Sequence, residues 1–501
     1  FKMPAGLAVL AATEGATFGI FPITWIVLCA VWLYEITVVS GRFEDLRGTF
    51  NLISDDPRIL AVLIAFCFGG LLEALAGFGA PVAITGVMLM AVGFPPLRAA
   101  TTVLLANTAP VAFGAIAIPI ITAGNLTGID YHSIGAYVGH QTPVMAWAVP
   151  LLLVLVADGV RGLKETWPVL LAVGLSFAVL QWISSTWISV ELTDVIASLG
   201  ALAVGVLVLR VVKPKGTEAA KERLLATREA ETAAGYVSTL DLSHHEAVVR
   251  RPDRKAIGMA LFPYLLVIVV FTIAKLVPVA STFLASTDLK IQWPGLYGNV
   301  LNAAGEPNSS TIYNFQWLSS PGTLLLLSGI VVALVYRVPM LEAAKTFGRM
   351  VHKLRWTFLT IASVLALAYV MNLSGQTITV GTWIASVGAI FAFLSPTLGW
   401  IGTAVTGSDT SANALFATLQ QTAATNAGID PTLLVAANTS GGVVGKMISP
   451  QNLAIAATAV GLVGKESDIF RTAIRWSLGL LLVLCILVGL QSTPVLSWML
   501  P

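Results

Sequence analysis

The stretch Asn438-Thr-Ser-Gly-Gly-Val-Val-Gly-Lys-Met-Ile-Ser-Pro-Gln-Asn452 decides the fold that we expect for this chain. It lies within an apolar run, yet it contains Asn, Thr, Ser, three glycines, a lysine and a proline. Irregular, polar backbone at membrane depth persists only where protein or a water-filled cavity covers it. Ionisable residues within the membrane, such as Lys446, mark functional sites by default. We therefore predict a broken transmembrane helix at a functional site.

A second stretch, Asn107-Thr-Ala-Pro-Val-Ala-Phe-Gly-Ala-Ile-Ala-Ile-Pro119, has the same skeleton of Asn-Thr, then Gly, then Pro at equal spacings. Each copy follows a polar, glycine-containing segment, Glu73-Ala-Leu-Ala-Gly-Phe-Gly-Ala-Pro81 in one case and Thr406-Gly-Ser-Asp-Thr-Ser-Ala-Asn413 in the other. Paired, interrupted hydrophobic segments at matching places in two halves of a chain indicate the binding site of a secondary transporter. The alternative is that both copies are kinked structural helices that resemble each other by chance.

The composition indicates a helical membrane protein that crosses the bilayer many times. Of the 501 residues, 56% are hydrophobic and 11% are charged, whereas soluble domains carry roughly 25% charged residues. The net charge of +2 gives no reason to expect a nucleic-acid partner. Cys29, Cys67 and Cys485 lie in apolar runs and are typical of small buried residues. We expect neither a metal nor a cofactor.

We expect an all-α protein built from two inverted repeats, with about ten spans and two re-entrant hairpins. The first repeat, 1–212, contains a hairpin at 58–93, a broken helix at 97–123 and linking helices in 167–212. Other spans in this half are predicted at 17–39, 134–156, 167–186 and 192–212. The charged segment 41–54 is predicted to lie at the membrane interface.

The second repeat, 257–501, follows a polar segment at 213–256 that we expect to be a cytoplasmic loop. It contains a hairpin at 396–427 and a broken helix at 431–464. An external loop is expected at 278–319. Further spans are predicted at 257–276, 321–338, 356–373 and 471–499, and the apolar segment 377–393 is paired with the interfacial segment at 41–54.

Lys and Arg in the loops set the orientation, because cytoplasmic loops carry an excess of both. Most basic residues fall in segments 40–58, 94–98, 159–166, 213–256, 337–355 and 464–475. By contrast, segments 125–133, 187–191 and 277–319 hold only Lys290. With the first set cytoplasmic, the two hairpins open to opposite sides of the membrane and the repeats are inverted.

The two repeats are uneven at their beginnings. Two spans, 257–276 and 321–338, precede the 356–373 span in the second repeat, but nothing equivalent precedes the 17–39 span. We therefore expect about two further helices upstream of Phe1 in the full-length protein.

Several long motifs, in the same order, resemble the bacterial L-lactate permease family. They are Glu73-Ala-Leu-Ala-Gly-Phe-Gly-Ala-Pro-Val-Ala-Ile84, Asn107-Thr-Ala-Pro-Val-Ala-Phe-Gly114, Gly162-Leu-Lys-Glu-Thr-Trp-Pro168, Thr406-Gly-Ser-Asp-Thr-Ser411, Lys446-Met-Ile-Ser-Pro-Gln-Asn452 and Gly461-Leu-Val-Gly-Lys-Glu-Ser-Asp468. The resemblance implies proton-coupled uptake of L-lactate and related 2-hydroxy monocarboxylates such as glycolate across the bacterial plasma (inner) membrane. It also implies an N-terminal stretch that is absent here. The architecture is similar to transporters with paired hairpins and an elevator-type movement, and a homo-oligomer is possible.

Three charged residues at membrane depth are expected to carry the chemistry. A small carboxylate substrate needs a positive partner, and Lys446 is predicted to contact it directly or through water. Asp409 is predicted to couple transport to protons, because a buried carboxyl group holds a proton more readily than one in water. Glu73 is the alternative proton-coupling residue. Structural alternatives are an ion pair of Lys446 with Asp409 or Glu73, and a helix-capping role for Asp409.

Polar side chains beside the expected helix breaks are predicted to bind the hydroxyl and carboxylate of the substrate. Their alternative role is to satisfy the backbone carbonyls that prolines leave free. These predicted substrate-binding residues are Asn107, Thr108, Asn438, Thr439, Ser408, Thr410 and Gly79, with the glycine allowing a tight turn.

Two rival functions remain from the sequence. One is a sodium-coupled or proton-coupled transporter of another organic anion, since Ser, Thr, Asn and carbonyl oxygens in the hairpins can also hold Na⁺. The other is a membrane-embedded enzyme, which would need a nucleophile–base pair or metal ligands at depth; the sequence shows no His cluster or serine-hydrolase motif.

Overall fold

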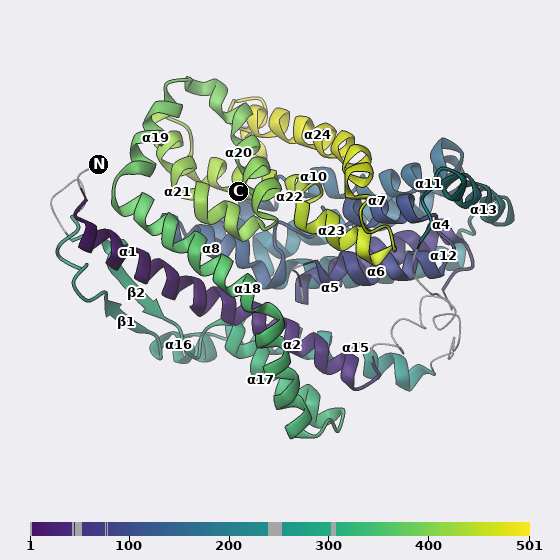
Figure 1. The fold of residues 1–501 in the computed structure, drawn as a ribbon, viewed down its shortest axis with the longest axis horizontal. Coiled ribbons are helices and arrows are strands. Elements are labelled where there is room, and N and C mark those ends of the chain that lie inside the picture. Colours follow the sequence, from purple (N-terminus) through teal and green to yellow (C-terminus); the bar gives the residue numbers. More distant parts are fainter. Residues whose placement is uncertain are drawn as a thin grey trace.

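The computed structural model describes residues 3–42, 45, 53–75, 77, 79–238, 253–301 and 307–501. Within these residues the fold is helical apart from one β-hairpin, in agreement with the predicted all-α class (Figure 1). Eight helical segments of the described chain are long and apolar enough to cross a membrane. This is fewer than the ten predicted, because some predicted spans consist of shorter apolar helices or share one bent helix. Most of the predicted interfacial segment at 41–54 lies outside the described residues.

The helices at the start of the two halves pack together into one unit, which we call the scaffold group. A π-helical turn at Gly19–Thr24 joins its first two helices. A β-carbon on Gly15 would lie 2.4 Å from the carbonyl oxygen of Leu365, so glycine lets two scaffold helices approach closely. The members are α1 (Ala5–Phe18), α2 (Trp25–Val39), α15 (Arg254–Leu276), α17 (Pro321–Val335) and α18 (Met340–Leu373).

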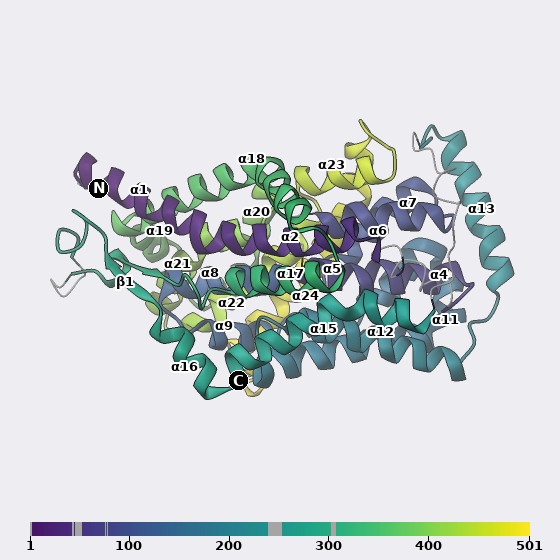
Figure 2. The same ribbon diagram turned by 90° about the horizontal axis from the view of Figure 1, so that it is seen from below.

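Two predicted loops lie at opposite ends of the molecule (Figure 2). The predicted external loop contains α16 (Pro278–Ser286) and an antiparallel hairpin of β1 (Leu289–Gln292) with β2 (Ile312–Phe315), in which Leu289 is opposite Phe315. The predicted cytoplasmic loop contains α13 (Thr217–Ala233). This separation agrees with the orientation derived from Lys and Arg.

Residues 57–91 form two helical arms joined by a turn, and residues 96–127 form an interrupted helix. One arm of the hairpin is α4 (Pro57–Ala61), a π-helical stretch at Val62–Phe68 and α5 (Gly69–Leu75), and the other arm is α6 (Ala80–Ala91). Gly77 and Gly79 have φ angles of +52° and +83°, which the turn requires and which favour glycine. The broken helix runs through α7 (Pro96–Ala106), an irregular stretch beginning at Asn107, and α8 (Ile118–Thr127).

The second hairpin and broken helix differ from the prediction in two details. The hairpin begins earlier, with α20 (Phe391–Thr406) followed by α21 (Asp409–Ala427). The broken helix consists of α22 (Pro431–Lys446) and α23 (Pro450–Ala459). Asn438 and Thr439 therefore lie inside an intact helix, and the expected break at this Asn-Thr pair is wrong. The break falls after Lys446 because Pro450 cannot donate a backbone hydrogen bond and starts a new helix.

Hairpins and broken helices from the two halves of the chain pack crosswise. Helix α6 of the first hairpin packs against α23 of the second broken helix, and α21 of the second hairpin packs against α8 of the first. Helix α20 packs tightly on α22: a β-carbon on Gly441 would lie 2.0 Å from the carbonyl oxygen of Pro396, and one on Gly445 would lie 2.3 Å from that of Trp400. Glycine at this spacing brings helix backbones together within membranes.

The remaining helices surround these elements and form with them a second unit, the hairpin group. Helix α11 is bent at Gly159, whose φ of 71° and ψ of −166° separate the two spans predicted at 134–156 and 167–186. Besides the hairpins and broken helices, the hairpin group contains α9 (Tyr131–Val138), α10 (Pro143–Ala146), α11 (Val149–Ile183), α12 (Thr193–Val211), α19 (Gln376–Ala385) and α24 (Glu466–Gln491).

A buried ion cluster ties α13 to the start of the first hairpin. Arg58, fully buried, contacts Asp56 at 2.7 Å, Asp158 at 3.3 Å and Glu165 at 2.5 Å. From α13, Arg223 contacts Asp158 at 2.6 Å and Glu165 at 3.1 Å. Burial alone would raise the pKa of Asp56, but hydrogen bonds and the charge of Arg58 bring that pKa below its ordinary value. The sequence placed Arg58 at the end of a span and gave no sign of this cluster.

Candidate functional site

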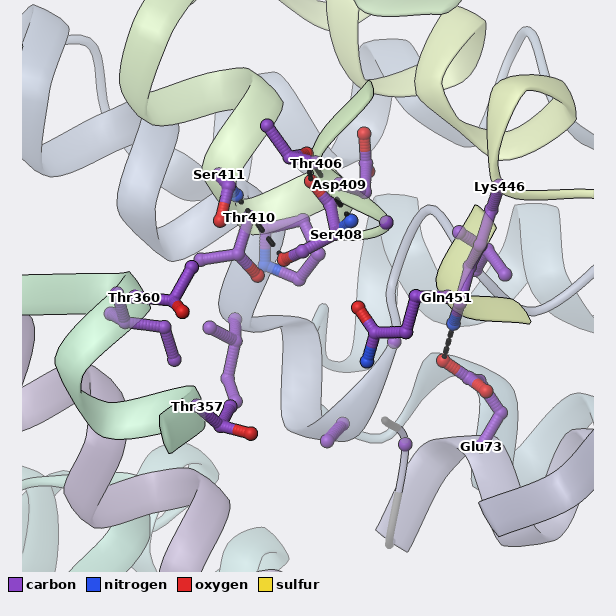
Figure 3. A pocket seen from close by; sticks show the side chains of 18 of the residues that line it. Glu73, Thr357, Thr360, Thr406, Ser408, Asp409, Thr410, Ser411, Lys446 and Gln451 are labelled. Carbon is purple, nitrogen blue, oxygen red and sulfur yellow. Dashed lines mark hydrogen bonds and ion pairs between the residues drawn. The ribbon is translucent and has the colours of Figure 1, made fainter. Parts of the chain in front are cut away.

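One polar cavity lies where the hairpin group faces the scaffold group (Figure 3). Its volume is about 240 Å³, whereas a single water needs only about 10–15 Å³ of such space. The second hairpin contributes Thr406–Ser411, the first contributes Glu73 and Gly77, and the second broken helix contributes Lys446 and Gln451. The opposite wall comes from α18. The cavity therefore has room for a small polar molecule at membrane depth.

An ion pair between the two repeats forms one end of this cavity (Figure 3). The Nζ atom of Lys446 donates a hydrogen bond of 2.6 Å to Oε1 of Glu73. The other carboxylate oxygen, Oε2, accepts a hydrogen bond of 2.9 Å from Nδ2 of Asn107. The side chains of Lys446 and Glu73 are 9% and 3% exposed. Lys446 also ends α22, where the partial negative charge of the helix C-terminus favours a cation.

Asp409 is a second buried carboxyl group in the cavity lining, at the start of α21. Its Oδ1 accepts a long hydrogen bond of 3.4 Å from Oγ1 of Thr403, and its Oδ2 has no hydrogen-bond partner among the described residues. The helix cap is Ser408, whose Oγ accepts a hydrogen bond from the backbone of Ser411. The capping role considered for Asp409 thus belongs to its neighbour, and Asp409 stays available to a ligand or a proton.

Gly442 makes space for Asp409. A β-carbon on Gly442 would lie 1.8 Å from Oδ1 of Asp409 and 2.6 Å from Oγ1 of Thr403. Gly442 lies on α22 one helical turn before Lys446, so the carboxyl group packs against the helix that carries the ammonium. The turn of the hairpin is itself set by Gly407, with φ of +75°.

Of the predicted site residues, five line the cavity and five do not. The lining includes Lys446, Glu73, Asp409, Ser408 and Thr410. It does not include Gly79, Asn107, Thr108, Asn438 and Thr439, so their predicted contact with substrate stays a prediction.

Asn438 and Thr439 instead join a buried hydrogen-bond network around Asn413 of the second hairpin. Asn438 donates to Oδ1 of Asn413 at 2.9 Å, and Thr439 donates to the same oxygen at 3.1 Å. Asn413 donates in turn to the carbonyl oxygen of Pro119 at 3.1 Å. This network satisfies buried polar groups and connects the second hairpin to the first broken helix.

Similar support is found at the first broken helix. Gln181 of α11 donates to the carbonyl oxygen of Ala109 at 3.1 Å, and it also donates to Asp194 of α12 at 3.1 Å. Thr108 donates to the carbonyl oxygen of Leu105 at 2.7 Å. Backbone groups freed by the break thus find partners inside the protein, as membrane depth requires.

Sequence reasoning did not assign a site role to five polar residues of the lining: Gln451, Thr357, Thr360, Thr406 and Ser411. Thr357 and Thr360 lie on one face of α18, which was predicted as an ordinary span. Their spacing was the signal in the sequence: two polar residues three positions apart lie on the same face of a helix and can line a cavity together. Gln451 stands directly after the proline that restarts the broken helix, within a motif that was quoted but not singled out.

Two opposed hairpins, a broken helix in each half, and a polar cavity with an ion pair at membrane depth define a multi-pass membrane transporter. Comparison with known proteins agrees: the family model described as L-lactate permease matches residues 1–495. The chain belongs to the L-lactate permease family, which confirms the predicted resemblance.

Curated relatives match over almost their entire length. The glycolate permease GlcA of Escherichia coli (strain K12) is 42% identical over 504 residues, covering 98% of this chain and 88% of that protein. The L-lactate permease of Bacillus subtilis (strain 168) is 41% identical over 518 residues, covering 100% and 90%. Among solved structures, Neisseria gonorrhoeae MtrF is similar with a TM-score of 0.48 and 15% identity, over 96% of this chain and 82% of that one.

Proposed function

We propose that this protein is a secondary active transporter that takes up L-lactate and related small 2-hydroxy monocarboxylates, such as glycolate, together with protons across the bacterial plasma membrane. The names of its relatives support the substrate class. The observation that carries the proposal is the Lys446–Glu73 ion pair in a cavity that also contains the buried carboxyl group of Asp409.

Lys446 binds the carboxylate of the substrate in this mechanism. It is the only basic residue in the lining of the described cavity. An ammonium paired with one carboxylate can shift toward a second one that enters the cavity. A charge-assisted hydrogen bond of this kind contributes about 1.5–3 kcal/mol.

Asp409 carries the coupled proton by competing for the same cation. When Asp409 is ionised, Glu73 and Asp409 together place two negative charges near one ammonium. Adding a third carboxylate is then unfavourable, by about 4 kcal/mol for a like charge 4 Å away at an effective dielectric constant of 20. Protonation of Asp409 from external water removes one charge and admits the anion. Loss of that proton to internal water restores the repulsion and expels the anion.

Movement of the hairpin group past the scaffold group would carry the loaded cavity between the two sides. The position of the cavity supports this, because one wall belongs to α18 of the scaffold and the rest belongs to hairpins and broken helices. With Asp409 protonated, the loaded site carries the same net charge as the empty site with Asp409 ionised, because the anion replaces the charge that the proton removes.

The test is uptake of labelled lactate into proteoliposomes with imposed pH or Na⁺ gradients. We expect accumulation when the outside is acidic, and none from a Na⁺ gradient alone. Accumulation driven by Na⁺ and indifferent to pH would overturn the proton-symport proposal in favour of sodium coupling. Failure of every 2-hydroxy acid to be transported, by protein that is monodisperse and intact, would overturn the substrate class.

The variant Asp409→Asn separates coupling from binding. It should retain exchange of external labelled lactate for internal unlabelled lactate, because this exchange needs the anion site but no net proton movement. It should lose accumulation against a gradient. If Asp409→Asn still concentrates lactate, the proton is carried elsewhere, and Glu73→Gln becomes the variant to measure.

A further inference from the structure

We propose that Gln451 recognises the 2-hydroxyl group of the substrate and thereby sets the preference for 2-hydroxy acids over plain carboxylic acids. The inference rests on the proposed function, and it assigns a specificity-determining role to a residue outside the charged set. It starts from the cavity lining, where Gln451 is the only side-chain amide among the described residues.

Gln451 stands between the two chemically different parts of the cavity. Figure 3 shows its amide group between the hairpin turn at Ser408 and the Lys446–Glu73 pair. It is the residue after Pro450 at the start of α23, immediately past the helix break. Gln451 is exposed and lines the cavity, and its helix α23 packs against α6, α7 and α24 of the hairpin group.

The second hairpin holds Gln451 in place. A β-carbon on Gly407 would meet only atoms of Gln451 as nearest neighbours, namely Oε1 at 2.5 Å, Cβ at 3.1 Å and Cδ at 3.3 Å. The glutamine therefore packs on the glycine of the hairpin turn. A side chain positioned from two elements loses less entropy when it binds a ligand than one that is free to rotate.

A carboxamide matches the chemistry of a 2-hydroxy carboxylate. The substrate presents a hydroxyl donor and a carboxylate acceptor on adjacent carbons. An amide presents an acceptor oxygen and a donor NH₂ on one carbon. With the carboxylate at Lys446, the amide oxygen of Gln451 can accept a hydrogen bond from the hydroxyl group of the substrate. Its NH₂ group can at the same time donate a hydrogen bond to a carboxylate oxygen. A plain carboxylate of the same size makes the second of these bonds but not the first.

Two hydroxyl groups of the hairpin turn, those of Thr406 and Ser408, already form hydrogen bonds with the backbone. Thr406 donates to the carbonyl oxygen of Gly402 at 2.8 Å and accepts from the backbone of Ser408 at 3.3 Å. Ser408 caps α21. Thr357 and Thr360 are on the scaffold wall, from which the hairpin group would move away during transport. Gln451 stays with Lys446 throughout, since both belong to the second broken helix.

The experiment compares how well lactate and propionate, which differ by the hydroxyl group alone, inhibit exchange of labelled lactate in proteoliposomes. In the wild type, lactate should inhibit at a concentration roughly tenfold lower than propionate, the effect of one hydrogen bond. In Gln451→Met, which keeps the length of the side chain, both acids lose the bond from the NH₂ group, but lactate also loses the bond to its hydroxyl group. The ratio of the two inhibitory concentrations should therefore fall from about ten to about one.

Three further variants test whether Gln451 or the scaffold wall recognises the hydroxyl group of the substrate. Gln292→Met, which removes an amide from the exposed strand β1, should leave the ratio unchanged. If Thr357→Val or Thr360→Val abolishes the ratio and Gln451→Met does not, the scaffold wall recognises the hydroxyl and the inference is overturned. It is also overturned if Gln451→Met weakens lactate and propionate equally. A wild type that transports no 2-hydroxy acid would instead count against the proposed function.

Discussion

Gly442→Ala tests the relation between α22 and the proposed proton site with a single methyl group. The added carbon would lie 1.8 Å from Oδ1 of Asp409, whereas ordinary van der Waals contact begins at 3.4 Å. One of the two groups must therefore move by roughly 1.6 Å. The backbone of α22 is held by its close packing on α20, so we expect the carboxyl group of Asp409 to move away from Thr403 into the cavity. Overpacking of this kind costs about 1–3 kcal/mol.

The expected result is a loss of proton-driven lactate accumulation with exchange largely retained, as in Asp409→Asn. The measurement is the steady-state ratio of internal to external lactate under an imposed pH gradient, beside the exchange rate. Gly479→Ala is the matched control, because a β-carbon at Gly479 of α24 meets nothing within 4 Å. Alanine there should leave transport unchanged and slightly favour the helix.

A double-variant cycle gives the decisive comparison. Because Asp409→Asn already abolishes accumulation, the two backgrounds are compared by exchange: if the methyl group acts only through the carboxyl group, Gly442→Ala should change the exchange rate little in either background. Wild-type accumulation by Gly442→Ala alone would refute the reasoning, since the carboxyl group would then work from a displaced position. A large loss of exchange in the two backgrounds would refute it as well, since the methyl group would then disturb the anion site.

Four further outcomes follow from the contacts described above. Lys446→Gln should weaken lactate binding by roughly 10- to 100-fold, in exchange as well as in accumulation, because a charge-assisted hydrogen bond is lost. Glu73→Gln should do the opposite and lower the apparent dissociation constant for lactate in a binding assay, because the ammonium of Lys446 no longer has a competing carboxylate. Arg58→Ala should destabilise the detergent-solubilised protein by about 3–5 kcal/mol in chemical or thermal unfolding, since it leaves buried carboxylates without their cation. The lowered pKa of Asp56 means that its charge stabilises the fold above its unfolded pKa of about 3.9, and that this contribution is lost as the pH falls through the folded value. The melting temperature of the wild type should therefore drop more steeply below about pH 4 than that of Asp56→Asn.

The hairpins and the first helix break could be predicted from sequence because the bilayer leaves few alternatives. Glycine, proline and polar residues in an apolar run need cover at membrane depth, and Gly77, Gly407 and Pro450 mark the places where the backbone turns or restarts. The pairing of Lys446 with Glu73 was among the alternatives considered, because isolated charges at that depth are unfavourable.

The second break and the scaffold wall could not be placed in this way. Asn438 has the same neighbours as Asn107 in sequence, yet its partners Asn413 and Gln420 come from α21 of the second hairpin and support an intact helix. Thr357 and Thr360 face a cavity only because the hairpin group lies opposite them. Arg58 is buried because segments distant in sequence supply Arg223 of α13 and the carbonyl oxygen of Lys215 beside the carboxylates. Such choices depend on tertiary contacts and not on local pattern.

The crossed packing of α6 on α23 and of α21 on α8 has a consequence for how the molecule can change shape. Displacing the turn of either hairpin shifts a half-helix from the other half of the chain, and that half-helix lies beside the turn of the other hairpin. Movement of one hairpin alone would disrupt both the α6–α23 contact and the α21–α8 contact. Movement of both hairpins together with their half-helices disrupts neither contact. The crossed packing therefore disfavours a state in which the cavity is open to both sides of the membrane at once.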